Sequence, residues 1–335
     1  MSASPTLGAV TPDQLSRTVC AAVRRAVADG ELARVAVPER VTVRRPPRPG
    51  DGDWATGVAL ALAGPAGRPA RQVAEVLRAR LCGVPGIARV EVAGPGFLNI
   101  SLDGAARARL VAELVRQGAD RPGAGEPSPG ETVGGASGEW VVVPPRHDAL
   151  RDAERWAAAT GEAPTGEAPT DGATDGAVDG AVDGASEGAG RTPSGAVPAH
   201  LAPLLVQRES NPLFRVQYAY ARTRALCRNA RDLGFSPDPE GAALEAPEEA
   251  ELLALLADHD RVSRLGAAGD TTRLARHLVA VADAVLRLHQ TWPLLPRGDE
   301  KPSAAHRARL ALAQAAGTVL AGGLSQLGVT APAHL

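Results

Sequence analysis

The chain has 335 residues, enough for two modest domains, and its formal net charge is −2. No charged start precedes an apolar run and no apolar stretch reaches about 18 residues, so we expect neither a signal peptide nor a membrane span. The three cysteines (Cys20, Cys82 and Cys227) are too widely spaced for a disulfide framework or a metal site, which indicates a reducing, cytoplasmic setting.

The charge is distributed unevenly along the chain. Residues 1–120 carry a formal charge of +5, residues 121–197 carry −8, and residues 198–335 carry +1. The middle segment repeats GEAPT and then Asp-Gly-Ala units, so it has little apolar surface to bury and carries mostly one sign of charge. This composition predicts a disordered linker at 121–197, between one domain at 1–120 and another at 198–335.

The first domain begins with a clear helix signal. The sequence TPDQ (residues 11–14) has the pattern of a capping box with proline at the first helical position, and the helix is expected to end near Gly30. Residues 39–45 alternate apolar and polar side chains and are predicted to form a strand. Asp53 is expected to cap a following helix over WATGVALAL.

Further helices and strands complete this domain. A helix is predicted over residues 69–83, followed by strands at 88–94 and 97–102 and a last helix at 103–117. The order of elements indicates a small α+β domain in which helices pack on a mixed sheet.

Residues 198–335 are predicted to be entirely helical. Asn211 and Asp270 are expected to be N-caps, and apolar residues after Asp270 recur at helical spacing. Helices are predicted over about 212–233, 247–257, 271–291 and 303–327. The second domain is therefore expected to be an all-α helix bundle.

Two surfaces are candidates for ligand contact. In the strand at 97–102, Leu98, Ile100 and Leu102 alternate with Phe97, Asn99 and Ser101, so the aromatic ring of Phe97 is expected on the polar face. The alternative is that this ring is covered and belongs to the core. In the helix at 212–233, one stripe within about 80° combines an amide, an aromatic ring and three guanidiniums: Gln217, Tyr220, Arg224, Arg228 and Arg231. The alternative for this stripe is a solvated helix face.

Sequence motifs at both ends resemble one family. DGDWATGVALALA (51–63) and VPGIARVEVAGPGFLNISL (84–102) resemble the N-terminal domain of arginyl-tRNA synthetases. Motifs within 211–230, 271–295 and 309–332 resemble the anticodon-binding (DALR-type) domain of the same enzymes. The order along the chain is also that of the synthetase.

The departures from the family pattern concern catalysis. The resemblance leaves no catalytic domain between the two ends, and no histidine lies in a HIGH-type context. A KMSKS-type loop is also excluded, because the only lysine is Lys301 and the only methionine is Met1. The chain therefore resembles the synthetase-related anticodon-binding proteins (NrtL type), and we expect no enzyme activity, catalytic residue, cofactor or metal.

The resemblance implies a tRNA partner, with arginine tRNA as the candidate. It implies that Phe97 and Asn99 contact a base in the D-loop at the tRNA elbow, while the helix at 212–233 contacts the anticodon stem-loop. Tyr220 stands where the family usually has histidine, which leaves base discrimination open. A protein partner bound by a decayed RNA surface is the alternative, and an arginine–tRNA ligase is a weaker one. The linker permits two arrangements: tethered domains that bind independently, or domains that pack together.

Overall fold

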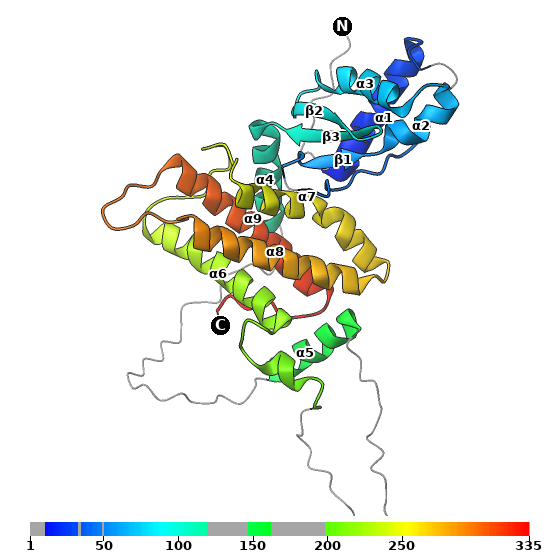
Figure 1. Cartoon of the computed structure of the whole chain (residues 1–335). Coiled ribbons are helices and arrows are strands. Elements are labelled where there is room, and N and C mark those ends of the chain that lie inside the picture. Colours follow the sequence, from blue (N-terminus) through cyan, green and yellow to red (C-terminus); the bar gives the residue numbers. More distant parts are fainter. Residues whose placement is uncertain (1–10, 33–34, 49, 120–146, 162–197, 335) are drawn as a thin grey trace, which may run out of the picture.

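The computed structural model describes residues 11–32, 35–48, 50–119, 147–161 and 198–334. Within these ranges the chain forms an N-terminal α+β domain and a C-terminal all-helical domain, as the sequence predicts (Figure 1). Most of the expected linker, 120–146 and 162–197, lies outside the described residues.

The first helix, α1 (Pro12–Ala28), begins with the predicted capping box. Gln14 N donates to Thr11 Oγ1 at 3.4 Å, and Thr11 N donates to the Gln14 side chain at 3.1 Å. Leu15 and Val19, both fully buried, lie on the face of α1 that packs against the domain core. The cap thus fixes where the amphipathic helix starts and which face it buries.

The sheet has three strands, β1 (Trp54–Thr56), β2 (Ile87–Ala93) and β3 (Phe97–Leu102), in the order β1-β3-β2. Both pairings are antiparallel, so the expectation of a mixed sheet is wrong. Helices α2 (Val58–Ala66) and α3 (Ala70–Leu81) pack against the sheet (Figure 1). Because β3 is central, its apolar residues Leu98 and Ile100 are fully buried.

Two local predictions in this domain are wrong. Residues 39–45 form no strand; a single bridge joins Arg44 to Ala55, although Val41 and Val43 are buried as the alternation requires. Asp53 does not cap a helix. Its carboxylate accepts a hydrogen bond from Leu102 N at 2.7 Å, and β1 rather than a helix follows it.

The helical domain is built from η1 (Ala202–Leu205), α6 (Pro212–Asp232), α7 (Pro247–Ala267), α8 (Thr271–Thr291) and α9 (Ala304–Gln326). The predicted caps are confirmed: Asn211 accepts from Phe214 N, and Asp270 accepts from Arg273 N, each at 3.1 Å. Helix α7 runs ten residues past its predicted end, because Val262 is still buried and Gly266 packs against Leu274.

A helix that sequence analysis missed lies within the predicted linker. Helix α5 (His147–Thr160) packs on α8 and η1, and its Trp156 is only 1% exposed. The carbonyl oxygen of Ala159 accepts hydrogen bonds from the hydroxyls of Thr271 and Thr272 at 3.1 and 2.9 Å. Helix α5 is therefore part of the helical domain.

The two domains pack directly on each other. Helix α4 (Gly104–Ala119) leaves the sheet and packs across α9 (Figure 1). The crossing is close, since a Cβ atom at Gly118 would clash with the Thr318 side chain. Arg107 on α4 joins the domains: it donates to both carboxylate oxygens of Asp53, at 3.0 and 3.1 Å, and to the Leu244 carbonyl at 3.0 Å.

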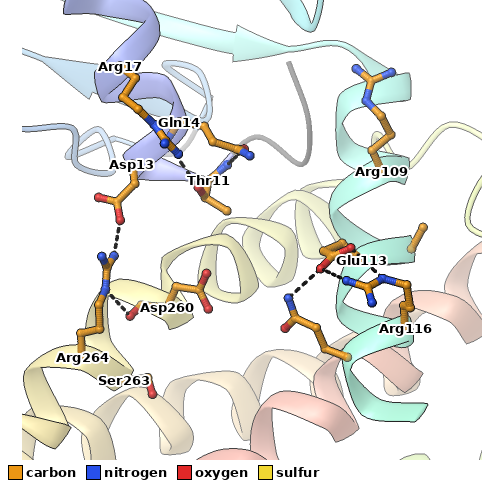
Figure 2. A pocket seen from close by; sticks show the side chains of 12 residues that line it. Thr11, Asp13, Gln14, Arg17, Arg109, Glu113, Arg116, Asp260, Ser263 and Arg264 are labelled. Atoms are coloured by element: carbon orange, nitrogen blue, oxygen red, sulfur yellow. Dashed lines mark hydrogen bonds and ion pairs between the residues drawn. The ribbon is translucent and has the colours of Figure 1, made fainter. Parts of the chain in front are cut away.

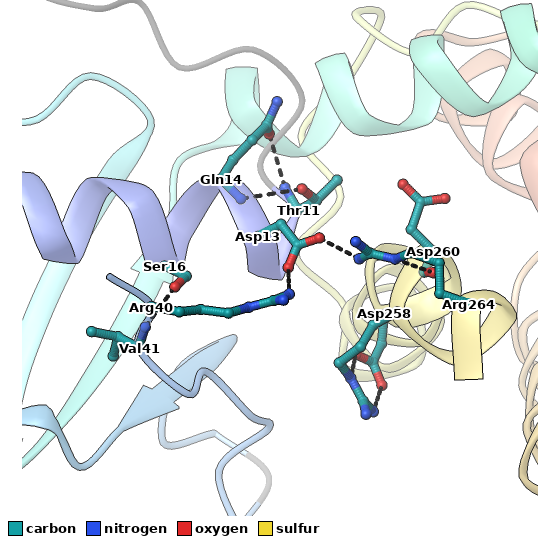
Figure 3. A network of polar contacts seen from close by, with 10 residues as sticks. Thr11, Asp13, Gln14, Ser16, Arg40, Val41, Asp258, Asp260 and Arg264 are labelled. Carbon is teal, nitrogen blue, oxygen red and sulfur yellow. Dashed lines mark hydrogen bonds and ion pairs between the residues drawn. The ribbon is translucent and has the colours of Figure 1, made fainter. Parts of the chain in front are cut away.

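A second contact joins α1 to α7. The two helices, with α4, surround a polar pocket (Figure 2). At its edge the Asp13 carboxylate pairs with Arg264 of α7 and with Arg40 of its own domain (Figure 3). Ser16 Oγ, one turn along α1, accepts from Val41 N at 2.9 Å and holds the segment that carries Arg40. Of the two arrangements that the linker permits, the structure has the packed one.

Candidate nucleic-acid interface

Phe97 lies at the start of β3, directly after the turn Gly94-Pro95-Gly96, and its side chain is 41% exposed. Gly96 has a φ of +143°, and a Cβ atom there would lie 2.9 Å from the carbonyl carbon of Ala70. Only glycine permits that conformation and that approach to α3. The prediction that the ring is exposed is confirmed.

The ring of Phe97 is supported from one side. A Cβ atom at Gly57, between β1 and α2, would lie 3.2 Å from Phe97 Cε1 and 3.5 Å from Leu60 Cδ1. Leu60 is itself 36% exposed. We call Gly57, Leu60 and Phe97 the Phe97 patch: one edge of the ring rests on the chain while the rest of it remains open.

Asn99 is only 8% exposed, contrary to the expectation of an open polar face. It shares the face of Phe97 by alternation, but it sits in the middle of the central strand between Ala55 of β1 and Glu91 of β2. Neighbouring strands on both sides cover a residue at such a position. Alternation identifies the face of a strand, whereas exposure depends on what flanks it.

The predicted stripe on α6 is partly covered. Tyr220, Arg224 and Arg228 are of intermediate exposure, with Tyr220 packed against the core, and only Arg231 is exposed. Gln217 donates through Nε2 to Asp152 of α5 at 3.1 Å and to the Thr330 carbonyl at 3.0 Å. The Gln217 amide therefore holds elements of the domain together.

The C-terminal segment after α9 accounts for this covering. Thr330 N donates to Asp152 Oδ1 at 2.9 Å, and Arg155 of α5 donates to the Gly328 carbonyl. Farther along, His334 Nδ1 lies 3.3 Å from Arg228 Nη2. These contacts lay the segment across α5 and along one side of α6.

The three arginines of the stripe lie within about one turn of Cys227 along α6. Burial raises the pKa of the Cys227 thiol, while the charges of Arg224, Arg228 and Arg231 act to lower it. All three guanidiniums are therefore close enough to Cys227 to affect its titration. Such a concentration of arginine side chains suits phosphate oxygens, which the planar guanidinium binds through two parallel hydrogen bonds.

Sequence reasoning missed the most exposed aromatic ring of α6. Tyr218 is 42% exposed and stacks on Phe214, with ring centroids 5.7 Å apart. The helical-angle analysis favoured Tyr220 because it lies among the arginines. The spacing of Phe214 and Tyr218, one turn apart outside the apolar stripe, was the signal that could have identified this pair.

The described residues provide two open aromatic surfaces and an arginine cluster. Among them, no group of three or more His, Cys, Asp or Glu side chains could hold a metal ion. In the described part of the chain, no helix is long and apolar enough to cross a membrane.

Comparisons with known proteins match this architecture. Residues 13–102 match the model of the arginyl tRNA synthetase N-terminal domain, and residues 216–335 match the DALR anticodon binding domain. Arginine–tRNA ligase of Renibacterium salmoninarum is 50% identical over 111 residues, 32% of this chain and 20% of that protein. Arginine–tRNA ligase of Frankia alni is 45% identical over 154 residues, 46% of this chain and 27% of the relative.

The solved structure of Thermus thermophilus arginyl-tRNA synthetase is similar in fold, with a TM-score of 0.50 at 16% identity over 96% of this chain and 100% of that one. The present chain spans about a fifth to a quarter of the length of the two ligases above. Only residues 103–215 separate its two matched segments. The chain thus contains two domains that match models from arginyl-tRNA synthetases, the N-terminal domain and the DALR anticodon binding domain.

Proposed function

We propose that this protein is a non-catalytic, cytoplasmic tRNA-binding protein, with arginine tRNA as the candidate ligand. The observation that carries the proposal is the pairing of two tRNA-synthetase domains with only residues 103–215 between them. The sequence also lacks HIGH-type and KMSKS-type motifs. Adenylate formation requires preorganised cations around the ATP phosphates, and those motifs normally supply them.

The Phe97 patch is the proposed contact with the tRNA elbow. An exposed ring with one supported edge can stack on an unpaired base, and such stacking contributes about 1–3 kcal/mol. Asn99 shares the same face but is only 8% exposed, so its amide could reach the edge of a base only if the side chains of the flanking strands move aside.

The proposed anticodon contact lies on α6. Arg224, Arg228 and Arg231 would pair with phosphates, Tyr220 and Gln217 would border them, and Tyr218 would offer a stacking surface on the adjacent face. Single-stranded loops expose unstacked bases, and aromatic side chains recognise these by stacking.

Direct packing of the domains supports a single binding body. When two sites are fixed relative to each other, the second contact follows the first without the entropic cost of closing a flexible chain. The proposal therefore predicts that contacts at Phe97 and at α6 reinforce each other in one complex.

The elbow contact is tested by Phe97→Ala, with fluorescence anisotropy of labelled tRNA as the readout. Loss of stacking predicts roughly 5- to 150-fold weaker binding. Phe97→Tyr, which keeps the ring, should bind within a few-fold of the parent. Val206→Ala is the matched control, because Val206 is 39% exposed, precedes α6 and belongs to neither proposed surface. Equal affinity of Phe97→Ala and this control would contradict the elbow contact.

The arginine cluster is tested by reversing Arg224 and Arg228 to Glu together. Loss of two phosphate contacts predicts weaker binding and a shallower dependence of log Kd on log salt, by roughly two units of slope. Reversing Arg273 and Arg276 to Glu together, at two exposed positions on α8, controls for the same change in net charge alone. An unchanged slope in the double variant would show that the stripe is only a solvated face.

A protein-interaction module remains the second candidate function. Two observations favour it: the C-terminal segment contacts Gln217 and Arg228, and residues 198–335 carry only +1 charge. This alternative predicts no salt-dependent RNA binding at any ionic strength. An arginine–tRNA ligase would instead show arginine-dependent ATP–pyrophosphate exchange, which the proposal predicts to be absent.

A further inference from the structure

The line where the two domains meet carries exposed arginines from both of them. Residues 39–48 of the N-terminal domain include four arginines and one glutamate, and all five of these side chains are exposed. This segment reaches α7 of the helical domain, because the Asp13 carboxylate joins Arg40 to Arg264 (Figure 3). On α7, Arg261 lies one turn before Arg264.

Arg45 extends this group of arginines toward α8. Burial lowers the pKa of His277 to about 4, and the charges of Arg261 and Arg45 act in the same direction. Both guanidiniums therefore lie near the same imidazole, although they come from different domains. Arg45 has no ion-pair partner within the described residues. We call the four arginines of this region the junction surface: Arg40, Arg45, Arg261 and Arg264.

The junction surface already holds one anion between the domains. Arg40 Nη2 pairs with one oxygen of the Asp13 carboxylate, and Arg264 Nη2 pairs with the other (Figure 3). Two guanidiniums from different domains are thus within reach of a single anionic group. Each guanidinium carries five N–H donors, and among the described residues Arg40 uses only Nη2. Donors therefore remain for a second, external acceptor.

The arginines form the outer layer of this surface. The side chains of Arg40 and Arg264 are 67% and 57% exposed, whereas that of Asp13 is 28% exposed. Arg261 is likewise more exposed than its partner Asp258. Exposed ion pairs contribute no more than about 1 kcal/mol, so such guanidiniums can turn to another anion at little cost. Four guanidiniums face these two carboxylates, which leaves the surface positive.

We propose that the junction surface binds the phosphate backbone of an RNA that contacts both domains. This inference rests on the proposed tRNA function, because an RNA that reaches both the Phe97 patch and α6 crosses the junction. Guanidiniums pair with phosphate oxygens through parallel hydrogen bonds. Such contacts fix the position of the RNA and read no base, so they carry no sequence preference. An RNA held by arginines of both domains also stabilises their packing.

The test compares two double variants of the full chain by fluorescence anisotropy of labelled tRNA across ionic strength. Arg45→Gln with Arg264→Gln removes one junction arginine from each domain, and should weaken binding and make the log–log salt slope shallower by roughly 1.5–2 units. Arg78→Gln with Arg287→Gln is the matched control. Each of these arginines is exposed, pairs with a carboxylate and lies in a different domain, outside the junction surface.

A third variant separates RNA binding from a purely structural role of the ion pairs. Asp13→Asn removes the carboxylate that competes for Arg40 and Arg264, so it should bind tRNA several-fold more tightly, whereas structural pairs alone predict no gain. Circular dichroism verifies the fold of each variant. If the parent binds tRNA but the two double variants have the same slope, the junction contact is overturned and the proposed function stands. If the parent binds no tRNA at low salt, both are overturned.

Discussion

Replacement of Arg107 by Met should uncouple the two domains. The guanidinium bridges the Asp53 carboxylate and the Leu244 carbonyl, and the side chains of Arg107 and Asp53 are only 18% and 9% exposed. Breaking a buried ion pair costs about 3–5 kcal/mol. Because Arg107 keeps some access to water and Asp53 retains its bond from Leu102 N, we expect a loss of about 2–3 kcal/mol in the free energy of unfolding.

Urea denaturation followed by tryptophan fluorescence measures this loss. Trp54 reports on the α+β domain, whereas Trp156 and Trp292 report on the helical one, so uncoupling should separate a single transition into two. A double-mutant cycle with Asp53→Asn isolates the pair and should give a coupling energy above about 1 kcal/mol. Arg89→Met is the control, because its pair with Glu91 is exposed and contributes less than about 1 kcal/mol. Equal losses in Arg107→Met and Arg89→Met would refute the reasoning.

Two further predictions concern the packing of the helices. Gly118→Leu should force α4 away from Thr318 and lower the melting temperature by several degrees in differential scanning calorimetry. Gly104→Ala is the control, because a Cβ atom at Gly104 meets open space and should change the melting temperature little. Equal shifts in the two variants would contradict the close crossing of α4 and α9. Burial, with the charge of the stacked His259, lowers the pKa of His277 to about 4. In the unfolded chain His277 is protonated below about pH 6.5, whereas in the folded chain it stays neutral down to about pH 4. The free energy of unfolding should therefore fall by about 2 kcal/mol between pH 7 and pH 5. His277→Leu should remove that part of the pH dependence in urea titrations, and an unchanged dependence would show that another group causes it.

Helix starts could be predicted from sequence because their determinants are local. The predicted caps at Thr11, Asn211 and Asp270 each bond a backbone amide within their own first turn, and the structure has all three. Such contacts depend on three or four consecutive residues, which the sequence displays directly.

Features that depend on contacts with distant residues could not be predicted from the sequence. Helix α5 is stabilised by burial of Trp156 and by hydroxyls of α8, and nothing within 147–160 indicates those partners. Residues 39–45 have the alternation of a strand but meet a partner only at Ala55.

In the candidate site, too, features set by neighbouring residues could be predicted and features set by distant residues could not. Exposure of Phe97 followed from alternation and from the turn before it, and it is confirmed. Burial of Asn99 depends on which strand is central, and the contacts of Gln217 depend on a segment 113 residues away. Helical angles gave the direction of the arginine stripe, but they could not show that the C-terminal segment lies beside it.

The affinity of the full chain for arginine tRNA, measured across ionic strength, tests the central claim most directly. The account predicts binding at low salt that weakens linearly in log–log form as salt rises, because the arginines of α6 displace counterions from phosphates. Failure to bind tRNA at low ionic strength would contradict it.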